Sequence, residues 1–361
     1  MSLLARYLFR NNLQLLLPTL AIGTGLYILS DLFDRIDDLM DSGVGLQIAL
    51  WYFIAKLPLI ISQILPAVFL LSTLVQLCMM SRARELVALQ AGGVSLGAIL
   101  RILMVCGLVW GGVQLGFSQV LGVAGERESS RIWQELVRKR ASDTVVLQRV
   151  WFTDGAWVVS LESVAPARGT GTGLSAYHLA SDGQHMDQVI RAESFTATPG
   201  DWTLNNVSVF DPTGYVVDKL PEKKLALQQD VATFQIVAPA TDPSRLPLWL
   251  LGDAIEKLRQ AGSNVESLRT AWHMKLSYAA SMAVMALVAV ALVTWRDNVY
   301  LSAGVALVFT FLFYSMFTVG GTVGQMGILP PPVAAWSANI LVAVVALWRI
   351  ILVIAPRRFG R

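Results

Sequence analysis

Carboxylates at the edge of an apolar segment are the first residues in this sequence that could do chemistry. Five of them follow the first apolar segment: Asp31, Asp34, Asp37, Asp38 and Asp41. Paired carboxylates near a membrane surface can act as general acid and base, as an enzyme that modifies lipids would need. This row is the only candidate for such chemistry in the chain, so an enzymatic interpretation would rest on it.

Histidine and cysteine form no recognisable catalytic or metal-binding motif. His178 and His185 have no Cys or Ser partner in such a motif, and His273 lies apart at a membrane boundary. Cys78 and Cys106 lie in apolar stretches without zinc spacing, where a thiol usually acts as a small hydrophobic side chain. We therefore predict no catalytic residue, no metal site and no disulfide.

The segment from Ser81 to Ser95 is a candidate docking site for a soluble partner. It reads S-R-A-R-E-L-V-A-L-Q-A-G-G-V-S, and the glycine pair would end a short helix within it. That helix would carry four residues on one face: Glu85, Leu86, Leu89 and Gln90. On spacing alone, a charged cytoplasmic turn is the commoner explanation of such a segment.

The scarcity of charged residues in the later apolar segments and the lack of a nucleotide-binding motif limit which energy source a transport function could use. Apart from Lys275 at the very start of the fourth, the last three apolar segments have no Asp, Glu, Lys, Arg or His before Arg349, whereas ion-coupled transporters normally keep such a residue within the membrane. The chain has no G-x-x-x-x-G-K-[ST] motif and so carries no Walker-type nucleotide site. Energy for transport would therefore come from a partner.

Composition places most of the chain in a bilayer. The sequence is 55% hydrophobic and 15% charged, with a mean hydropathy of +0.56, far from the norm of soluble domains. Its net charge of +3 includes no long basic run, which argues against nucleic-acid binding. Six segments are long enough to cross a membrane: 13–30, 57–80, 94–122, 274–294, 299–319 and 332–353.

A polar region separates the third and fourth apolar segments. Its short alternating runs and turn pairs such as Asp154-Gly155 and Asp182-Gly183 predict an antiparallel sandwich or jellyroll-like domain. The predicted strands cover 145–152, 157–162, 173–179, 188–198, 202–210 and 215–220. A charged helix over 126–140 would lead in, and an amphipathic helix over 248–260 would lead out.

The predicted fold is thus a membrane all-α bundle of three plus three helices with an inserted all-β domain. The expected domains are residues 1–123, including the candidate docking segment 81–95, then 124–245, then 246–361. Arginines of short loops fall on one side of this topology: Arg6, Arg10, Arg82, Arg84, Arg296, Arg357, Arg358 and Arg361. The positive-inside rule makes that side cytoplasmic, so both termini would be inside and the β domain periplasmic.

The order of these features resembles a known family. The segment after Ser81 is similar to the R-x-x-E-L-x-x-L-x-A-x-G-x-S/T coupling region of the LptF/LptG permeases, membrane subunits of the ATP-binding-cassette exporter of lipopolysaccharide. The resemblance extends over nearly the whole chain. The Leu248 to Gly262 segment and the turn from Gly327 to Pro331 look more like the G subunit than the F subunit.

The resemblance implies a noncatalytic permease of the bacterial inner membrane that extracts lipopolysaccharide from the outer leaflet and passes it to a periplasmic β-jellyroll bridge. Its partners would be a homologous permease (LptF), a dimeric cytoplasmic ATPase (LptB), a single-span periplasmic jellyroll protein (LptC) and a bridge protein (LptA). ATP and magnesium would be used by the ATPase, and no cofactor would be bound by this chain.

In such a permease, Glu85 would enter a groove of the ATPase and pair with a basic side chain there, flanked by Arg82, Arg84 and Leu89. The first and fifth membrane helices would line a cavity for the lipid. The resemblance thereby implicates residues 15–29 and 305–317. The bulky candidates for acyl-chain contact are Phe309, Phe311, Phe313 and Tyr314, although aromatic residues in membrane helices more often serve packing.

The sequence departs from the family at the outer end of the first helix, where some relatives carry lysines and this chain carries the aspartate row. The remaining basic candidates for lipid phosphate are Arg35, Lys56, Arg269 and Lys275. Snorkelling to ordinary headgroups explains such residues equally well. Outside the permease class, a noncatalytic receptor or assembly scaffold with a periplasmic β sensor is the alternative function.

Overall fold

The computed structural model describes residues 3–138, 147–166, 168–180, 185–198, 200–211, 216–228, 246–260, 264–294 and 299–354. The chain forms two compact units. One combines Met1–Arg138 with Arg269–Arg361, and the other is Lys139–Leu268. Several predicted features lie outside the described residues: Arg296, Arg357, Arg358, Arg361 and the Asp182-Gly183 turn.

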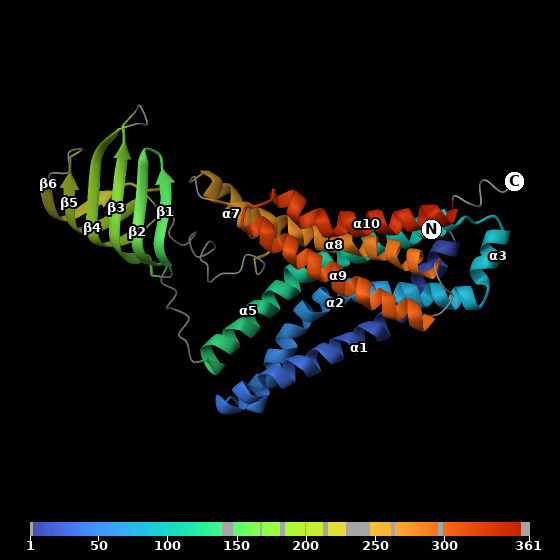
Figure 1. Ribbon diagram of the computed structural model, residues 1–361. Coiled ribbons are helices and arrows are strands. Elements are labelled where there is room, and N and C mark those ends of the chain that lie inside the picture. The colour runs from blue at the N-terminus through green and yellow to red at the C-terminus, as the bar shows by residue number, and fades with distance from the viewer. Residues whose placement is uncertain are drawn as a thin grey trace. The chain divides into compact units, whose positions relative to one another are not determined.

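Six helices of the described residues are long and apolar enough to cross a membrane, as predicted. They are α1 (Leu3–Asp41), α2 (Leu46–Arg82), the helix that begins as α4 (Leu96–Phe117), α8 (Glu266–Val293), α9 (Val299–Gln325) and α10 (Pro331–Ile354). The short α3 (Glu85–Ala91) lies between α2 and α4. In Figure 1, α1 begins and α10 ends at the end of the bundle that carries α3.

The first and third spans are longer than expected. The apolar part of α1 ends near Asp31, yet the helix continues to Asp41. The α4 helix likewise does not end at Gly122 but runs on through a π-helical segment at Ser118–Gly122, α5 (Val123–Arg131) and a second π-helical segment at Ile132–Val137. The charged helix predicted over 126–140 is therefore the continuation of the third span.

Small residues bring the two groups of three helices together. Gly107 and Gly111 of α4 face the backbone of α8, because a Cβ on Gly111 would overlap the carbonyl oxygen of Ala279 and one on Gly107 would come within 2.8 Å of the Met282 oxygen. The four-residue spacing of these glycines is typical of closely packed membrane helices. Ser277 and Asn339 then join α8 to α10, since the Asn339 Nδ2 donates to the backbone carbonyl oxygen of Ser277 at 2.6 Å.

A proline in α2 creates the polar centre of the bundle. Pro66 has no N–H to donate to the carbonyl of Ser62, four residues earlier. The Nε2 of Gln114 in α4 donates to that carbonyl at 3.2 Å. The hydroxyls of Tyr278 and Tyr314 donate to the adjacent Gln63 carbonyl, so α2, α4, α8 and α9 are joined at the proline.

The other unit contains one antiparallel sheet in which each strand pairs with the next along the chain. Its strands are β1 (Leu147–Asp154), β2 (Trp157–Ala165), β3 (Thr170–Leu179), β4 (Met186–Thr198), β5 (Asp201–Phe210) and β6 (Val216–Leu225). All six predicted strands are present. Gly155, at the predicted β1–β2 turn, has the positive φ of 59° that tight hairpins require.

The sheet curls on itself. Phe152 of β1 and Trp202 of β5 lie 5.7 Å apart between ring centroids, although three strands separate them in the sheet. Strands are about 4.8 Å apart, so a flat sheet would place these rings about 19 Å from each other. The described strands thus form an open roll with an apolar interior that includes Val159, Leu174 and Ile190.

Candidate functional site

The segment predicted to dock a partner forms a short helix at the end of the membrane bundle. Arg84 precedes it in a left-handed conformation, with φ of 56°, and Gly93 follows it with φ of 86°. The positive φ angles of these two residues limit α3 to Glu85–Ala91, between the end of α2 and the beginning of α4. The predicted short helix ended by Gly92-Gly93 is confirmed.

The residues of α3 divide into an inner and an outer face. Leu86 and Leu89 both contact the apolar core of the bundle, so these two leucines anchor α3. On the other face Val87 is 63% exposed. Arg82, Arg84 and Gln90 are exposed or half-exposed as well, and Glu85 is half-buried. Sequence reasoning missed Val87 because a helix this short shows no clear apolar stripe.

Glu85 is connected to the first membrane helix. The hydroxyl of Tyr7 in α1 donates a hydrogen bond to Glu85 Oε2 at 2.8 Å. Further into the bundle, Asn12 Nδ2 donates to Thr73 Oγ1 at 3.0 Å, and Gln76 Nε2 donates to the Leu8 carbonyl at 2.9 Å. The beginning of α1 is therefore tied to both α3 and the end of α2.

At the opposite end of α1, two predicted phosphate ligands meet around one aspartate. Lys56 Nζ lies 2.7 Å from both carboxylate oxygens of Asp31, and Arg35 Nε lies 3.1 Å from Oδ1. Lys56 and Asp31 side chains are each only 11% exposed, whereas the Arg35 side chain is 31% exposed. Lys56 is thus engaged in a partly buried ion pair, and Arg35 is the more accessible cation.

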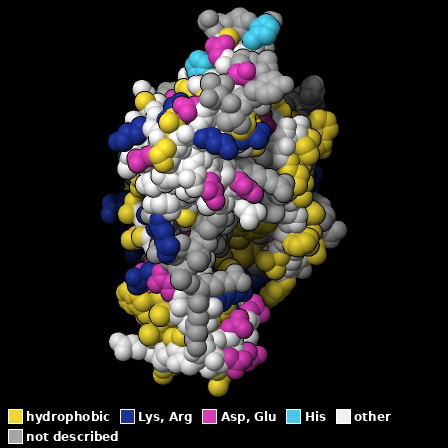
Figure 2. All heavy atoms as spheres, turned by 90° about the vertical axis from the view of Figure 1, so that its left-hand side faces the viewer, with side chains coloured by type: hydrophobic (Ala, Val, Ile, Leu, Met, Phe, Trp, Pro, Cys, Tyr) yellow, Lys and Arg dark blue, Asp and Glu magenta, His cyan; other side chains and the backbone are white. Residues whose placement is uncertain are grey.

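Aromatic rings orient the Arg35 guanidinium. Its Cζ lies 4.3 Å from the ring centroid of Trp133 and 5.7 Å from that of Tyr52. Cation–π contact at these distances is favourable and leaves the guanidinium in a defined position. The other aspartates of the row are exposed, and acidic side chains gather at this end of α1 and α2 in the lower part of Figure 2.

The aromatic candidates of α9 point in different directions. Phe313 is fully buried, and the hydroxyl of Tyr314 bonds to the Gln63 carbonyl, so both hold the bundle together. Phe309 is half-buried against the same core, whereas Phe311 is 71% exposed. Lys275 lies on α8, three residues before Tyr278, which contacts Tyr314.

The first and fifth spans are the least covered of the six. In the most apolar 18-residue stretch of each helix, 11% of residues are buried in α1 and 17% in α9. Their exposed faces carry large side chains, such as Ile22 and Leu26 on α1 and Phe311 on α9. Such faces meet either lipid or another membrane subunit.

A multi-pass bundle with a β unit inserted between its third and fourth spans and a short exposed helix between its second and third defines a class of membrane subunit. The family described as the lipopolysaccharide export system permease LptF/LptG matches residues 6–352. The chain belongs to this family. It is a noncatalytic transmembrane subunit of an ATP-binding-cassette exporter, in which ATP is used by the ATPase partner. No curated relative matches the chain.

Proposed function

We propose that this chain is the G-type permease of the exporter, located in the bacterial inner membrane with both termini cytoplasmic and the β domain periplasmic. It would pair with LptF, LptB, LptC and LptA, take lipopolysaccharide from the outer leaflet and pass it to the periplasmic bridge. The supporting observation for the lipid route is the exposure of α1 and α9, the two spans least buried by the chain itself.

The assignment to the G type rests on two local segments. Helix α7 (Leu248–Gln260) buries Leu251, Ala254 and Leu258 on one face, as an amphipathic helix should. The turn after α9 places Gly327 at φ of 74°, with the Ile328 N–H donating to the Val323 carbonyl at 3.2 Å. Both segments are those in which the sequence looks more like the G subunit.

Complementation tests the subunit type. Bacteria depleted of the G subunit should recover lipopolysaccharide export and growth when this chain is expressed, whereas bacteria depleted of the F subunit should not. Recovery only in the F-depleted strain would reverse the assignment. Copurification of a soluble ATPase and a second six-span subunit tests the assembly, and their absence would favour a receptor or scaffold.

Glu85 is the proposed point of contact with the ATPase, flanked by Arg82 and Arg84. Its hydrogen bond from Tyr7 would let movement of α3 reach α1, one of the helices of the lipid route. Leu89 would act indirectly, by holding α3 against the bundle. Nucleotide-driven closure of the ATPase would therefore pull on α1 as well as on α3.

Charge variants of Glu85 separate its two contacts. Glu85→Arg should abolish ATP-driven export, because it reverses the charge offered to a basic ATPase groove. Glu85→Gln keeps a hydrogen-bond acceptor for Tyr7 and should retain partial export. Measurement of lipopolysaccharide release from proteoliposomes with ATP compares them, and full export by Glu85→Arg would exclude this role.

Lipid phosphate would be met at the periplasmic side by Arg35, Lys56 and Lys275, with Phe309, Phe313 and Tyr314 shaping the wall of α9. Asp31 pairs with both Arg35 and Lys56, but the Arg35 side chain is 31% exposed and that of Lys56 only 11%, so Arg35 is the stronger candidate of these two. Photocrosslinking of lipopolysaccharide should fall more for Arg35→Gln than for Lys56→Gln. If crosslinking in both variants and in the Lys56→Gln/Lys275→Gln double variant remained as strong as in the unmodified chain, these residues would be excluded from the site.

A further inference from the structure

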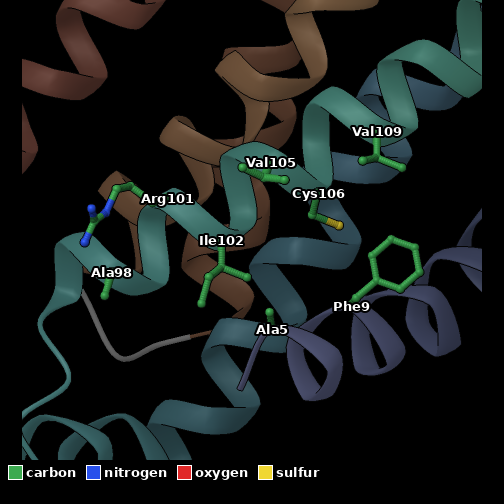
Figure 3. A pocket seen from close by; sticks show the side chains of 8 residues that line it. All are labelled: Ala5, Phe9, Ala98, Arg101, Ile102, Val105, Cys106 and Val109. Carbon is green, nitrogen blue, oxygen red and sulfur yellow. The ribbon is translucent and has the colours of Figure 1, made fainter. Parts of the chain in front are cut away.

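A groove of about 620 Å³ runs between the beginning of α1 and α4, and its lining residues lie outside the segments 15–29 and 305–317 assigned to the lipopolysaccharide route. Figure 3 labels the residues of its wall: Ala5 and Phe9 lie on α1, and Ala98, Arg101, Ile102, Val105, Cys106 and Val109 lie on α4. Small side chains, Ala5 and Ala98, leave space between the two helices at one end. The groove is apolar apart from the guanidinium of Arg101.

The groove is as long as one membrane leaflet. Ala98 and Val109 are eleven residues apart on α4, which corresponds to about 16 Å along a helix. Half of the hydrocarbon core of a bilayer is about 15 Å thick. Because α4 begins at Leu96, the end with Ala98 lies near the membrane surface that carries α3.

Arg101 lies at the surface end of this groove. In Figure 3 its guanidinium points toward the start of α4, whereas the Phe9 ring lies toward the Val109 end. The side chain is exposed, and no carboxylate among the described residues forms a salt bridge with it. A cation in this position suits a phosphate group at headgroup level.

The charge of the groove distinguishes between a lipid and a helix of a partner subunit. Transmembrane helices consist mainly of apolar residues, so a helix packed against this wall would leave the Arg101 guanidinium without an anionic partner. An anionic phospholipid supplies a phosphate for Arg101 at headgroup level and an acyl chain for the apolar wall. The single cation therefore favours one lipid over a helix of a partner subunit.

We propose that this groove binds one anionic phospholipid of the leaflet next to α3. The lipid phosphate contacts Arg101, and an acyl chain lies along Val105 and Val109. This site is separate from the transported lipopolysaccharide, which the exporter takes from the other leaflet. It would place a structural lipid between α1, a helix of the proposed lipid route, and α4, the helix that follows α3.

Native mass spectrometry of the full chain, purified with whatever subunits accompany it, tests the charge requirement. Micelles would contain equal amounts of phosphatidylglycerol and phosphatidylcholine. The unmodified chain should retain one phosphatidylglycerol, and Arg101→Gln should reduce its occupancy about tenfold, as expected for loss of a charge-assisted hydrogen bond. Arg349→Gln, which removes an arginine from α10 outside the groove, should leave occupancy unchanged.

A steric pair tests the acyl-chain contact. Val105 and Val113 lie on α4 and are 59% and 52% exposed, but only Val105 lines the groove. Val105→Trp should displace the lipid, whereas Val113→Trp should not. Equal thermal stability of the four variants would show that the differences come from binding and not from unfolding.

A photoreactive benzophenone side chain at position 109 identifies the occupant. Crosslinking to phosphatidylglycerol supports the proposal, and crosslinking to a protein subunit would replace it with a helix-docking site. Equal retention of both phospholipids, or equal occupancy in Arg101→Gln and Arg349→Gln, would show an ordinary annular lipid and overturn it. None of these readouts requires lipopolysaccharide export, so failure here is distinct from failure of the proposed function.

Discussion

Helices α8 and α1 are both apolar enough to cross a membrane, yet they meet opposite surroundings. In α8, 78% of the most apolar stretch is buried by the rest of the chain, compared with 11% in α1. Alanines allow α8 to be surrounded closely: Ala279 and Ala283 meet the glycines of α4, and Ala286 and Ala289 are fully buried. Large outward side chains such as Leu26 cover much of α1.

This difference separates the roles of the two helices. A helix enclosed on all sides is a fixed centre for its neighbours, because its movement would disrupt many close contacts. A helix held along one face and at its two ends can change position at lower cost. Polar contacts hold α1 toward each of its ends. Tyr7 donates a hydrogen bond to Glu85 at one end, and Asp31 pairs with Lys56 toward the other.

The largest expected effects come from changing enclosed positions, and the first of these lies where α4 meets α8. Gly111→Leu would place a side chain against the Ala279 carbonyl of α8 and should destabilise the bundle by about 3 kcal/mol, the upper range for overpacking. Gly112→Leu is the matched control, since a Cβ there meets nothing within 4 Å. Thermal unfolding in detergent would compare them, and similar losses would argue against close α4–α8 contact.

Two phenylalanines test the same contrast within one helix. Phe313→Ala should cost about 3 kcal/mol because it empties a fully buried position, whereas Phe311→Ala should change the stability of the isolated chain by less than about 0.5 kcal/mol. Phe311→Ala should instead weaken copurification of the second permease or crosslinking of lipid. If both variants lost equal stability, the exposed face of α9 would have to be covered within this chain.

The smallest of these effects concerns the part of α1 that begins the aspartate row. Asp31→Asn should cost about 2 kcal/mol, because it leaves Lys56 with little solvent and no paired charge. Asp34→Asn removes an exposed carboxylate three residues away and should cost less than about 0.5 kcal/mol. Chemical denaturation measures both, and an unchanged free energy of unfolding in Asp31→Asn would show that the ion pair does not secure α1.

Much of this architecture could be predicted from the sequence. Apolar runs of about 20 residues identified the six spans, because every such run must satisfy its backbone within a helix in lipid. Turn pairs such as Asp154-Gly155 identified the strands, and Gly92-Gly93 identified the end of α3. These are local signals, readable without knowing which segments meet.

Only the tertiary structure decided which face of each helix is covered. The mean hydropathy of the most apolar stretch is 1.6 in α1 and 2.2 in α8, so both read as membrane spans although their burial differs sevenfold. Lipid tails are as apolar as a protein interior, which leaves no polar stripe in the sequence to mark the exposed side.

The same reason explains the candidate site residues. Sequence grouped Lys56 with Arg35 as phosphate ligands and Tyr314 with Phe311 as lipid contacts, from residue type alone. In the structure Lys56 pairs with Asp31, and Tyr314 bonds to a carbonyl beside Pro66. Those partners are distant in the chain, so contact between helices, and not any local pattern, determined which side chains remain available.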